Sequence, residues 1–338
     1  MDSVAIVILN WNRMDDTRRC LDSVFRQTNK TFSVVLVDNA STERATATSL
    51  KNLQTLYQEK LVILQNGTNK GFAGGVNTGI EYARTHGFKY VALLNNDATV
   101  DENWLDKLLE AAEPKDVGIV TGLLLHADGK TIDSTGDWYS TWGLPFPRAR
   151  DNSANTAPAS GYVFGASGGA SLYKTALFDD IGLFDEVYFA YYEDTDISFR
   201  ANLRKWKIYY TNKAVAYHEQ GATSSKIPGF TVYQTMKNLP LLYIKNVPTG
   251  LLIPIGIRFW LSYILFLLNA VRKGSAIPAL KGWVVGCWYF LTHGIVKRWA
   301  IQRGRKLSTP ELKNQLWHDL PPDQTGLRKC RAFFVRGK

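Results

Sequence analysis

Cysteine is scarce in this chain, and the scarcity removes two classes of protein. Three cysteines occur among 338 residues, at Cys20, Cys287 and Cys330. They are too few and too scattered for a disulfide-stapled secreted domain or a thiolate zinc site. With 45% hydrophobic and 21% charged residues, the chain also differs from disordered and collagen-like proteins. We therefore expect one large globular domain or two, in a reducing compartment.

Acidic residues are almost absent from the last third of the chain. Residues 226–338 carry 18 Lys and Arg against 3 Asp and Glu, a net of +15, whereas residues 1–225 carry 22 against 27, a net of −5. The basic residues flank long apolar stretches rich in tryptophan, such as 251–268. Because nucleic-acid-binding modules do not carry such runs, we expect an anionic membrane surface as the partner, and no nucleic acid.

Neither apolar segment of this region has the composition of a clean membrane span. A spanning helix needs about 20 mostly apolar residues. The first segment, 249–271, contains Arg258, and the second, 277–299, is interrupted by Lys281 and His293. An arginine deep in the bilayer costs about 2.5–3.5 kcal/mol on insertion scales. These features predict peripheral or monotopic helices lying in the interface, with a pair of core helices packed on the rest of the chain as the alternative.

The first part of the chain alternates short β-branched runs with helix-like segments. The predicted strands are 4–9, 32–37, 61–64 and 90–94, and the predicted helices are 15–26, 43–58, 73–85 and 101–112. This alternation predicts an α/β fold with a Rossmann-like, mostly parallel sheet and helices on both faces. In such sheets ligands bind at the carboxyl ends of the strands.

No glycine-rich turn follows the first predicted strand. Dinucleotide-binding domains need such a turn so that the backbone can approach a pyrophosphate, so its absence counts against a nicotinamide-dependent dehydrogenase or epimerase. Polar side chains follow the strands instead: Asn10 and Asn12 after the first, Asp38 after the second, Asn95 and Asn96 after the fourth. Asp38 has the chemistry to read a nucleotide base and also to cap the next helix, and the residues alone leave both roles open.

Two further side chains have the chemistry of metal ligands. Asp97 closes an Asn-Asn-Asp run at a strand exit, where a carboxylate can hold a hard divalent cation against a diphosphate, although turns favour the same residues. His218 ends an apolar run, and a lone histidine in that setting is more often a hydrogen-bonded core residue than a ligand. Taken alone, both residues favour a structural role.

Three carboxylates crowd into four residues later in the chain. Glu193, Asp194 and Asp196 lie so close in sequence that the pKa of at least one should rise, which suits a general base. Asp196 stands four residues before Arg200, so we expect these two to pair on a helix. Glu193 and Asp194 then stay as the chemical candidates, with an acidic helix N-terminus as the alternative.

In chain order, these clusters resemble those of the family 2 glycosyltransferases of the GT-A fold, especially bacterial rhamnosyltransferases. The blocks that carry the resemblance are V-I-L-N-W-N at 7–12, V-D-N-A-S-T at 37–42, N-K-G-F-A-G-G-V-N-T-G-I at 69–80, L-L-N-N-D at 93–97, G-L-F-D-E at 182–186, Y-E-D-T-D at 192–196 and Y-H at 217–218. The resemblance implies a GT-A catalytic domain at 1–225, with a nucleotide-sugar half at about 1–115 and an acceptor half at about 116–225. Membrane-associating helices and a basic tail would follow at 226–338.

The resemblance also implies roles for single residues. It makes Asp194 the catalytic base with Glu193 beside it, Asp97 and His218 the ligands of Mg²⁺ or Mn²⁺, and Asp38 the reader of the donor's base. The remaining residues expected to bind the nucleotide-sugar are Asn10, Asn12, Asn69, Gly71, Asn77, Asn95 and Asn96. Asn95 replaces the first aspartate of the family's Asp-x-Asp motif, which lowers the negative charge of the expected metal site.

The implied reaction is metal-dependent, inverting transfer of a sugar from a nucleotide diphosphate-sugar to a hydroxyl of a lipid-linked glycan in cell-envelope polysaccharide synthesis. Rhamnose from dTDP-rhamnose is the preferred donor, and the cytoplasmic face of the bacterial inner membrane is the expected location. Two alternatives stay open. One is a polyprenyl-phosphate sugar synthase or processive polysaccharide synthase of the same fold, and the other is a non-catalytic sugar-binding scaffold. The sequence also leaves homo-oligomerisation open.

Overall fold

The computed structural model describes residues 3–219, 226–322 and 324. The strands are β1 Val4–Asn10, β2 Phe32–Asp38, β3 Leu61–Gln65, β4 Tyr90–Asn95, β5 Ala98–Val100, β6 Val117–His126, β7 Ile132–Ser134, β8 Asp137–Tyr139, β9 Pro145–Pro147, β10 Gly161–Val163, β11 Ala170–Lys174 and β12 Lys207–His218. The α-helices are α1 Met14–Phe25, α2 Thr46–Tyr57, α3 Gly71–Thr85, α4 Trp104–Ala111, α5 Thr175–Ile181, α6 Glu193–Leu203, α7 Phe230–Asn246, α8 Thr249–Arg272, α9 Ala276–Tyr289, α10 Ile295–Arg303 and α11 Thr309–Gln315. A 3₁₀ turn, η3 (Glu186–Tyr188), precedes α6, and a π-helical turn, η5 (Phe290–Gly294), joins α9 to α10. The four predicted strands and four predicted helices all form, with ends that differ by a few residues.

Within the described residues, ten strands form one twisted sheet. Its order is β10-β12-β6-β11-β4-β1-β2-β3, with β5 paired to β12 and β7 paired to β6. The strands from β3 to β4 run parallel, as predicted. Beyond them β11 runs antiparallel to both β4 and β6, while β12 runs parallel to β6. The second half of the sheet is therefore mixed, and it returns β12 to the edge at which β4 ends.

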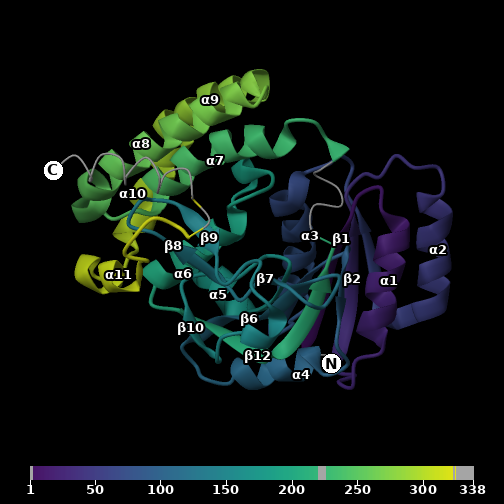
Figure 1. The fold of residues 1–338 in the computed structure, drawn as a ribbon. Helices are drawn as coiled ribbons and strands as arrows, with labels where there is room; N and C mark the ends of the chain where they lie inside the picture. The colour runs from purple at the N-terminus through teal and green to yellow at the C-terminus, as the bar shows by residue number, and fades with distance from the viewer. Residues whose placement is uncertain (1–2, 220–225, 323, 325–338) are drawn as a thin grey trace.

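Helices cover both faces of this sheet (Figure 1). Side chains of β1 alternate between the faces, so Ile6 and Ile8 pack into the core under α1, α2 and α4, whereas Ala5 and Val7 pack into the core under α3, α5 and α6. Trp104 of α4 is fully buried in the first of these cores. The predicted α/β fold with helices on both faces is confirmed.

A third core joins the carboxyl-terminal helices to α6. Phe199 and Leu203 of α6 pack with Leu239 and Leu242 of α7, and residues of α8, α9 and α11 complete the cluster. In Figure 1 these helices form a layer at one end of the molecule, away from α1 and α2. Glycines allow close packing within the layer, since a Cβ at Gly282 of α9 would lie 2.4 Å from a backbone oxygen of α7.

Buried ion pairs also tie α7 to the first part of the chain. Lys245 of α7 is 1% exposed, and its Nζ contacts Asp185 at 2.5 Å and Asp196 of α6 at 2.9 Å. His293 of η5 contacts Asp185 through Nε2 at 2.9 Å. Burial raises the pKa of Asp185, but the positive charge of Lys245 and the hydrogen bonds from Lys245 and His293 outweigh it and hold that pKa well below its usual range.

The division into units at 1–225 and 226–338 stays a prediction, and its boundary adjoins residues 220–225, which lie outside the described residues.

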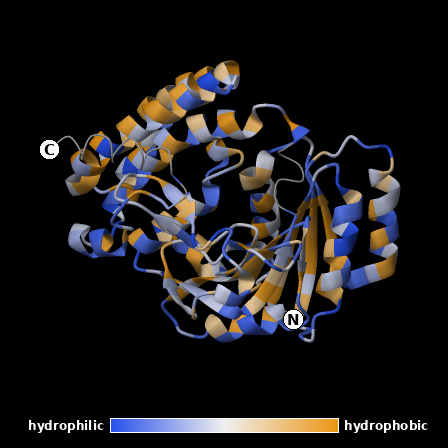
Figure 2. Cartoon of the chain, in the orientation of Figure 1, coloured by the Kyte–Doolittle hydropathy of each residue, from blue (hydrophilic) through white to orange (hydrophobic). Residues whose placement is uncertain are grey.

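The outer face of α8, α9 and α10 is apolar and exposed. Among the described residues, α8 is the one helix long and apolar enough to cross a membrane, with a mean hydropathy of 2.0 in its most apolar window, of which 33% is buried. Figure 2 shows hydrophobic residues along these helices. The large apolar side chains exposed on them, hereafter the apolar face, are Ile253, Ile257, Leu261, Ile264, Leu268, Val271, Ile277, Leu280, Trp283, Val284, Trp288, Leu291, Ile295, Val296 and Trp299. Of the helical region and basic tail predicted at 226–338, residues 323 and 325–338 lie outside the described residues.

Candidate active site

The register of the parallel strands brings the predicted polar side chains to one edge. Asn10 at the end of β1 lies opposite Asp38 at the end of β2, and Leu9 lies opposite Asn95 at the end of β4. Carboxyl ends of parallel strands share an edge, so residues far apart in sequence meet there. His218 comes to the same edge because the last residues of β12 pair with β5, which begins directly after Asp97.

Asp38 and Asn10 form a buried hydrogen-bonded pair. Asn10 Nδ2 donates to Asp38 Oδ1 at 2.8 Å, and Ser41 Oγ donates to the same oxygen at 2.6 Å. Asp38 Oδ2 accepts from the Ser41 amide at 3.3 Å. The next helix, α2, has Ala45 at its N-cap with no side-chain cap bond, so Asp38 does not cap it. Of the two roles considered for Asp38, the helix cap is thus removed.

The other asparagines hold the loops around this pair. Asn12 Oδ1 accepts from the Thr42 amide at 2.7 Å, which fixes the chain after β2. Asn69 Oδ1 accepts from the Gly71 amide at 2.8 Å. Gly71 has φ +69, and a Cβ there would lie 2.3 Å from the carbonyl oxygen of Phe189, so no larger residue fits.

Asn77 lies inside the protein and is used structurally. Its side chain donates to the carbonyl of Phe184 at 2.9 Å and accepts from the amide of the same residue at 3.0 Å. Asn77 Nδ2 also donates to Glu186 Oε1 at 3.1 Å. These bonds hold the segment before η3 against α3. Both polar atoms of the Asn77 side chain therefore already have protein partners.

Asp97 and His218 are in direct contact. His218 Nε2 lies 3.2 Å from Asp97 Oδ1 and 3.3 Å from Asn95 Nδ2. His218 is largely buried, which lowers its pKa, but hydrogen bonds from its ring to Asp133 and Asp97 and the charges of both carboxylates raise the pKa to about 9. Both ring nitrogens of His218 thus face carboxylates, and its role as a metal ligand stays a prediction.

The donor set of this pair fits a divalent cation. Mg²⁺ and similar ions bind one or two protein ligands at about 2.1 Å and complete their shells with water and substrate phosphates, which places neighbouring ligands about 3 Å apart. The 3.2 Å between Asp97 Oδ1 and His218 Nε2 matches that spacing. No group of three His, Cys, Asp or Glu side chains with metal-binding spacing occurs in the described part of the chain. The remaining ligands would thus come from the donor and from water.

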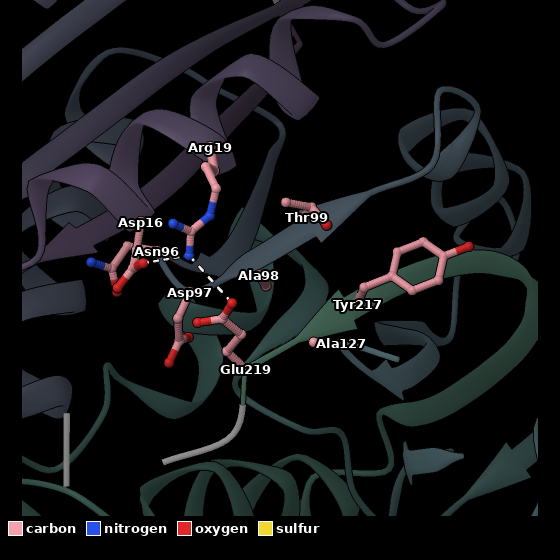
Figure 3. A pocket seen from close by; sticks show the side chains of 9 residues that line it. All are labelled: Asp16, Arg19, Asn96, Asp97, Ala98, Thr99, Ala127, Tyr217 and Glu219. Carbon is pink, nitrogen blue, oxygen red and sulfur yellow. Dashed lines mark hydrogen bonds and ion pairs between the residues drawn. The ribbon is translucent and has the colours of Figure 1, made fainter. Parts of the chain in front are cut away.

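A pocket opens beside Asp97 (Figure 3). Its lining consists of Asp16, Arg19, Asn96, Asp97, Ala98, Thr99, Ala127, Tyr217 and Glu219. Figure 3 shows Arg19 on α1 reaching from one side toward Glu219, with which it pairs at 3.3 Å, while Asp97 and Asn96 point in from the loop after β4. Arg19, a cation next to the expected diphosphate site, was not predicted from the sequence.

Asp194 and Glu193 stand at the N-terminus of α6 in different surroundings. Asp194 is half-buried, and its carboxylate accepts from the amides of Gly168 at 3.2 Å and Thr195 at 2.7 Å. Glu193 is 6% exposed, and its Oε2 has no hydrogen-bond partner among the residues that the structure describes. Burial and then the charge of Asp194 raise the pKa of Glu193 to about 8, and burial also raises the pKa of Asp194.

Two adjacent glycines connect Asp194 to the end of β4. The Gly168 amide donates to Asp194 Oδ2 at 3.2 Å, and the Gly169 carbonyl accepts from the Asn95 amide at 2.9 Å. A Cβ on Gly168 would lie 3.4 Å from the Cβ of Asp194, so the backbone approaches α6 closely there. The base candidate and the Asn-Asn-Asp run are therefore parts of one site.

Asp196 has the structural role expected for it. Its carboxylate pairs with Arg200 Nε at 2.9 Å, as the spacing predicted, and with Lys245 Nζ at 2.9 Å. Asn246 also donates to Asp196 at 2.8 Å. Asp196 is fully buried, and its bonds to Lys245 and Asn246 anchor α6 to α7.

Two further acids lie near the site, and neither was predicted from the sequence. Asp133 on β7 accepts from His218 Nδ1 at 2.8 Å. Asp137 on β8 is buried, and its pKa is raised well above the usual range by burial and by the charge of Asp194. Neither residue belongs to a motif, and each reaches the site only through pairing of short strands, so no sequence pattern singled them out.

Comparisons with known proteins show the family and the fold of this chain. A model of the family described as Glycosyl transferase family 2 matches residues 5–182. One relative is the low-salt glycan biosynthesis hexosyltransferase Agl10 of Haloferax volcanii, 22% identical over 244 residues, which covers 70% of this chain and 74% of that protein. Another is the N-acetylglucosaminyl-diphospho-decaprenol L-rhamnosyltransferase of Mycobacterium tuberculosis, 26% identical over 249 residues, which covers 67% of this chain and 79% of that protein.

Solved structures share the fold at lower sequence identity. The mannosyltransferase PcManGT of Pyrobaculum calidifontis, in complex with GDP-Man and Mn²⁺, aligns with a TM-score of 0.54 and 14% identity over 93% of this chain and 87% of that one. TarS 1–349 of S. aureus aligns with a TM-score of 0.53 and 15% identity over 89% and 90%. The predicted GT-A fold is confirmed. With more than half of its residues matched by the family model, this chain belongs to glycosyl transferase family 2.

Proposed function

We propose that this chain is an inverting, metal-dependent glycosyltransferase that moves a sugar, preferably rhamnose from dTDP-rhamnose, to a hydroxyl of a lipid-linked glycan. The observation that carries the proposal is the junction at Gly168 and Gly169. It holds Asp194 against the strand end that bears Asn95, and Asp97 and His218 lie beside that strand end. A single displacement at an anomeric carbon requires a base for the acceptor hydroxyl and, on the opposite side, groups that bind the departing diphosphate.

The donor would lie along the strand ends. Asp38 Oδ2 accepts one hydrogen bond from the Ser41 amide, and its second lone pair would accept from an N–H of the donor's base. The asparagines at 10, 12 and 69 shape the loops around Asp38. Asp97 and His218 would hold the divalent ion, which when bound neutralises charge on the departing diphosphate. Arg19 lines the same pocket, where its guanidinium pairs with Asp16 and Glu219.

Asp194 is the base in this mechanism, and Glu193 supports it. Asp194 would take the proton from the acceptor hydroxyl while that oxygen attacks the anomeric carbon from the face opposite the diphosphate. Its raised pKa makes it a better proton acceptor than an exposed aspartate. Glu193, with a pKa of about 8, keeps its proton at neutral pH and does not compete for the role.

The apolar face supports the proposed acceptor and location. Its exposed tryptophans and the cations near them, Arg258, Lys281 and Arg303 among them, suit an anionic membrane interface. Side chains of this kind favour a peripheral or monotopic position at the cytoplasmic face of the bacterial inner membrane, where a polyprenyl-linked glycan would present its hydroxyl. The related rhamnosyltransferase of M. tuberculosis is named for a decaprenol-linked substrate.

The alternatives are less well supported. A processive synthase or polyprenyl-phosphate sugar synthase with its own channel would need several spanning helices, and one helix of the described residues meets the length and hydropathy of a span. A non-catalytic scaffold would have no need to keep Asp97, His218 and Asp194 together. Here all three are present and linked through Asn95 and two glycines.

A nucleotide-sugar panel tests the proposal. Purified full-length protein, incubated with a polyprenyl-diphosphate-linked acceptor and each donor in turn, should release nucleoside diphosphate with one donor. EDTA should abolish the release, and Mn²⁺ or Mg²⁺ should restore it. His218→Ala should lose turnover at all metal concentrations tested or require much more metal. Full activity in EDTA would remove the cation from the mechanism, and no turnover with any donor would contradict the transferase itself.

A further inference from the structure

His218 is held from both sides of its ring. Its Nδ1 lies 2.8 Å from Asp133 Oδ2, and its Nε2 lies 3.2 Å from Asp97 Oδ1. The two carboxylates come from opposite neighbours of β12, because β5 follows Asp97 and pairs along one side of β12, whereas β7 carries Asp133 and pairs with β6 on the other side. The imidazole therefore bridges two acids that the sheet holds in place.

Asp133 is itself fixed by a second residue. Its side chain is 3% exposed, and Arg150 Nη2 lies 2.8 Å from the remaining oxygen, Oδ1, in an ion pair without hydrogen-bond geometry. Arg150 Nε also donates to the Asp133 backbone carbonyl at 2.9 Å. A buried carboxylate with one oxygen on an arginine and the other on an imidazole has little freedom to rotate, so the direction of its bond to His218 is set by the fold.

The position of Asp133 decides between two roles at a cation site: a direct ligand of the cation, or a residue that orients the ligand His218. A direct ligand would have to share the side of the ring on which Nε2 and Asp97 meet. Asp133 contacts the other ring nitrogen, so the cation site at Nε2 faces away from it. A carboxylate that accepts the Nδ1 proton leaves the lone pair of the neutral ring on Nε2, and outer partners of this kind orient metal-ligating histidines.

We propose that Asp133, held by Arg150, is a positioning residue that aims His218 Nε2 at the Asp97 side of the site and so sets the affinity for the divalent cation. The inference rests on the proposed function, in which Asp97 and His218 bind that cation. It adds a residue pair that no motif contains. Asp133 touches neither substrate nor cation, and it acts only through the imidazole.

Calorimetric titration of full-length protein with Mn²⁺, in the presence of nucleoside diphosphate, tests the inference without any turnover. Asp133→Ala should weaken Mn²⁺ binding about 10- to 100-fold. Asp133→Asn keeps an oxygen that can accept from Nδ1, so it should restore part of the affinity. The matched control is Asp151→Asn, an exposed aspartate next to Arg150 that pairs with His126 and not with His218, and it should bind Mn²⁺ like the parent protein.

His218→Ala makes the two possible failures distinguishable. If His218→Ala binds Mn²⁺ as tightly as the parent, the proposed metal site is wrong and the role of Asp133 is wrong with it. If His218→Ala binds weakly but folded Asp133→Ala binds normally, the positioning role alone is overturned.

A measurement on the unaltered protein covers the case in which Asp133→Ala does not fold. Nitrogen-15 NMR of histidine-labelled protein loaded with diamagnetic Mg²⁺ should show a proton on Nδ1 of His218 and none on Nε2. A proton on Nε2 in the Mg²⁺-loaded protein would overturn the inference, because that nitrogen could then not face the cation as a ligand.

Discussion

Asp194 and Glu193 are neighbours in sequence with different chemistry at the residue scale. Asp194→Asn keeps the shape of the side chain and an oxygen for one of the two backbone amides that donate to Asp194, but it cannot take a proton. We expect transfer to fall about 10²- to 10⁴-fold while donor affinity, measured by calorimetry, stays within a few-fold of the parent. Glu193→Gln should reduce transfer far less. Near-normal transfer by Asp194→Asn would show that the base has been misassigned.

Glu193 should make stability depend on pH. Burial and the charges of Asp194 and Asp196 raise its pKa to about 8, against an opposing effect of Lys237 on α7. The folded protein then keeps this proton between about pH 4.5 and 8, where the unfolded chain has lost it, so stability from this group is lost as pH rises through that window. Glu193→Gln should remove a decline of up to about 1.4 kcal/mol per pH unit. Urea denaturation of both proteins at pH 6 and pH 8 measures it, and parallel pH dependences would contradict the account.

Asp38 should govern donor affinity. Because it caps no helix, its loss removes a base contact and the bonds to Asn10 and Ser41. Calorimetry of folded Asp38→Ala with the nucleoside diphosphate should give a several-fold lower affinity. Unchanged nucleotide affinity would limit Asp38 to holding the loop.

Residues at strand ends could be predicted from the sequence, and their outer partners could not. Asp38 and Asp97 each follow an apolar run, and the parallel pairing of β1, β2 and β4 places them at one edge. His218 ends another apolar run and reaches this edge through the antiparallel pairing of β12 with β5. Asp133 lies 85 residues from His218 and meets it only because the three-residue strand β7 pairs with β6. The periodicity of so short a strand carries no signal.

At the scale of elements, the apolar face of α8 to α10 invites a direct test. Ile253 and Ile257 on α8 are 75% and 70% exposed, so charges there should leave the core intact. The double substitution Ile253→Glu with Ile257→Glu should reduce co-sedimentation with vesicles rich in phosphatidylglycerol. Leu56→Glu on α2, an equally exposed leucine at 66%, is the matched control and should bind like the parent. Equal binding by all three proteins would contradict a membrane role for this face.

The strands β1 to β4 were predictable, whereas α7 was not. The early strands are short apolar runs bounded by polar residues, which is a strong signal. Helix α7 contains Pro240 and buries Gln234, Lys237, Asn238 and Lys245, so its pattern is not that of an apolar core helix. Those polar groups have partners on other segments, such as the bonds from Asn238 to the carbonyls of Tyr188 and Ala190, and no local pattern reveals them.

At the scale of the whole molecule, the charge asymmetry and the third core act together. The basic, apolar helices of the carboxyl-terminal region pack against α6, the helix that begins with the proposed base. When the apolar face binds a membrane, the packing of α7 against α6 would therefore hold the active site at a fixed position relative to that membrane. The sequence predicted the membrane-seeking composition, but the shared core depends on long-range packing between Phe199 and Leu239 and was not predictable.

The most direct test of the central claim is a proton NMR time course of one transfer reaction by the full-length protein with Mg²⁺, its preferred nucleotide-sugar and a lipid-linked acceptor analogue. The account predicts that the donor's anomeric signal decays as a product signal of the opposite anomeric configuration grows, with one nucleoside diphosphate released per sugar transferred. A product that retains the donor's configuration would contradict direct displacement assisted by Asp194.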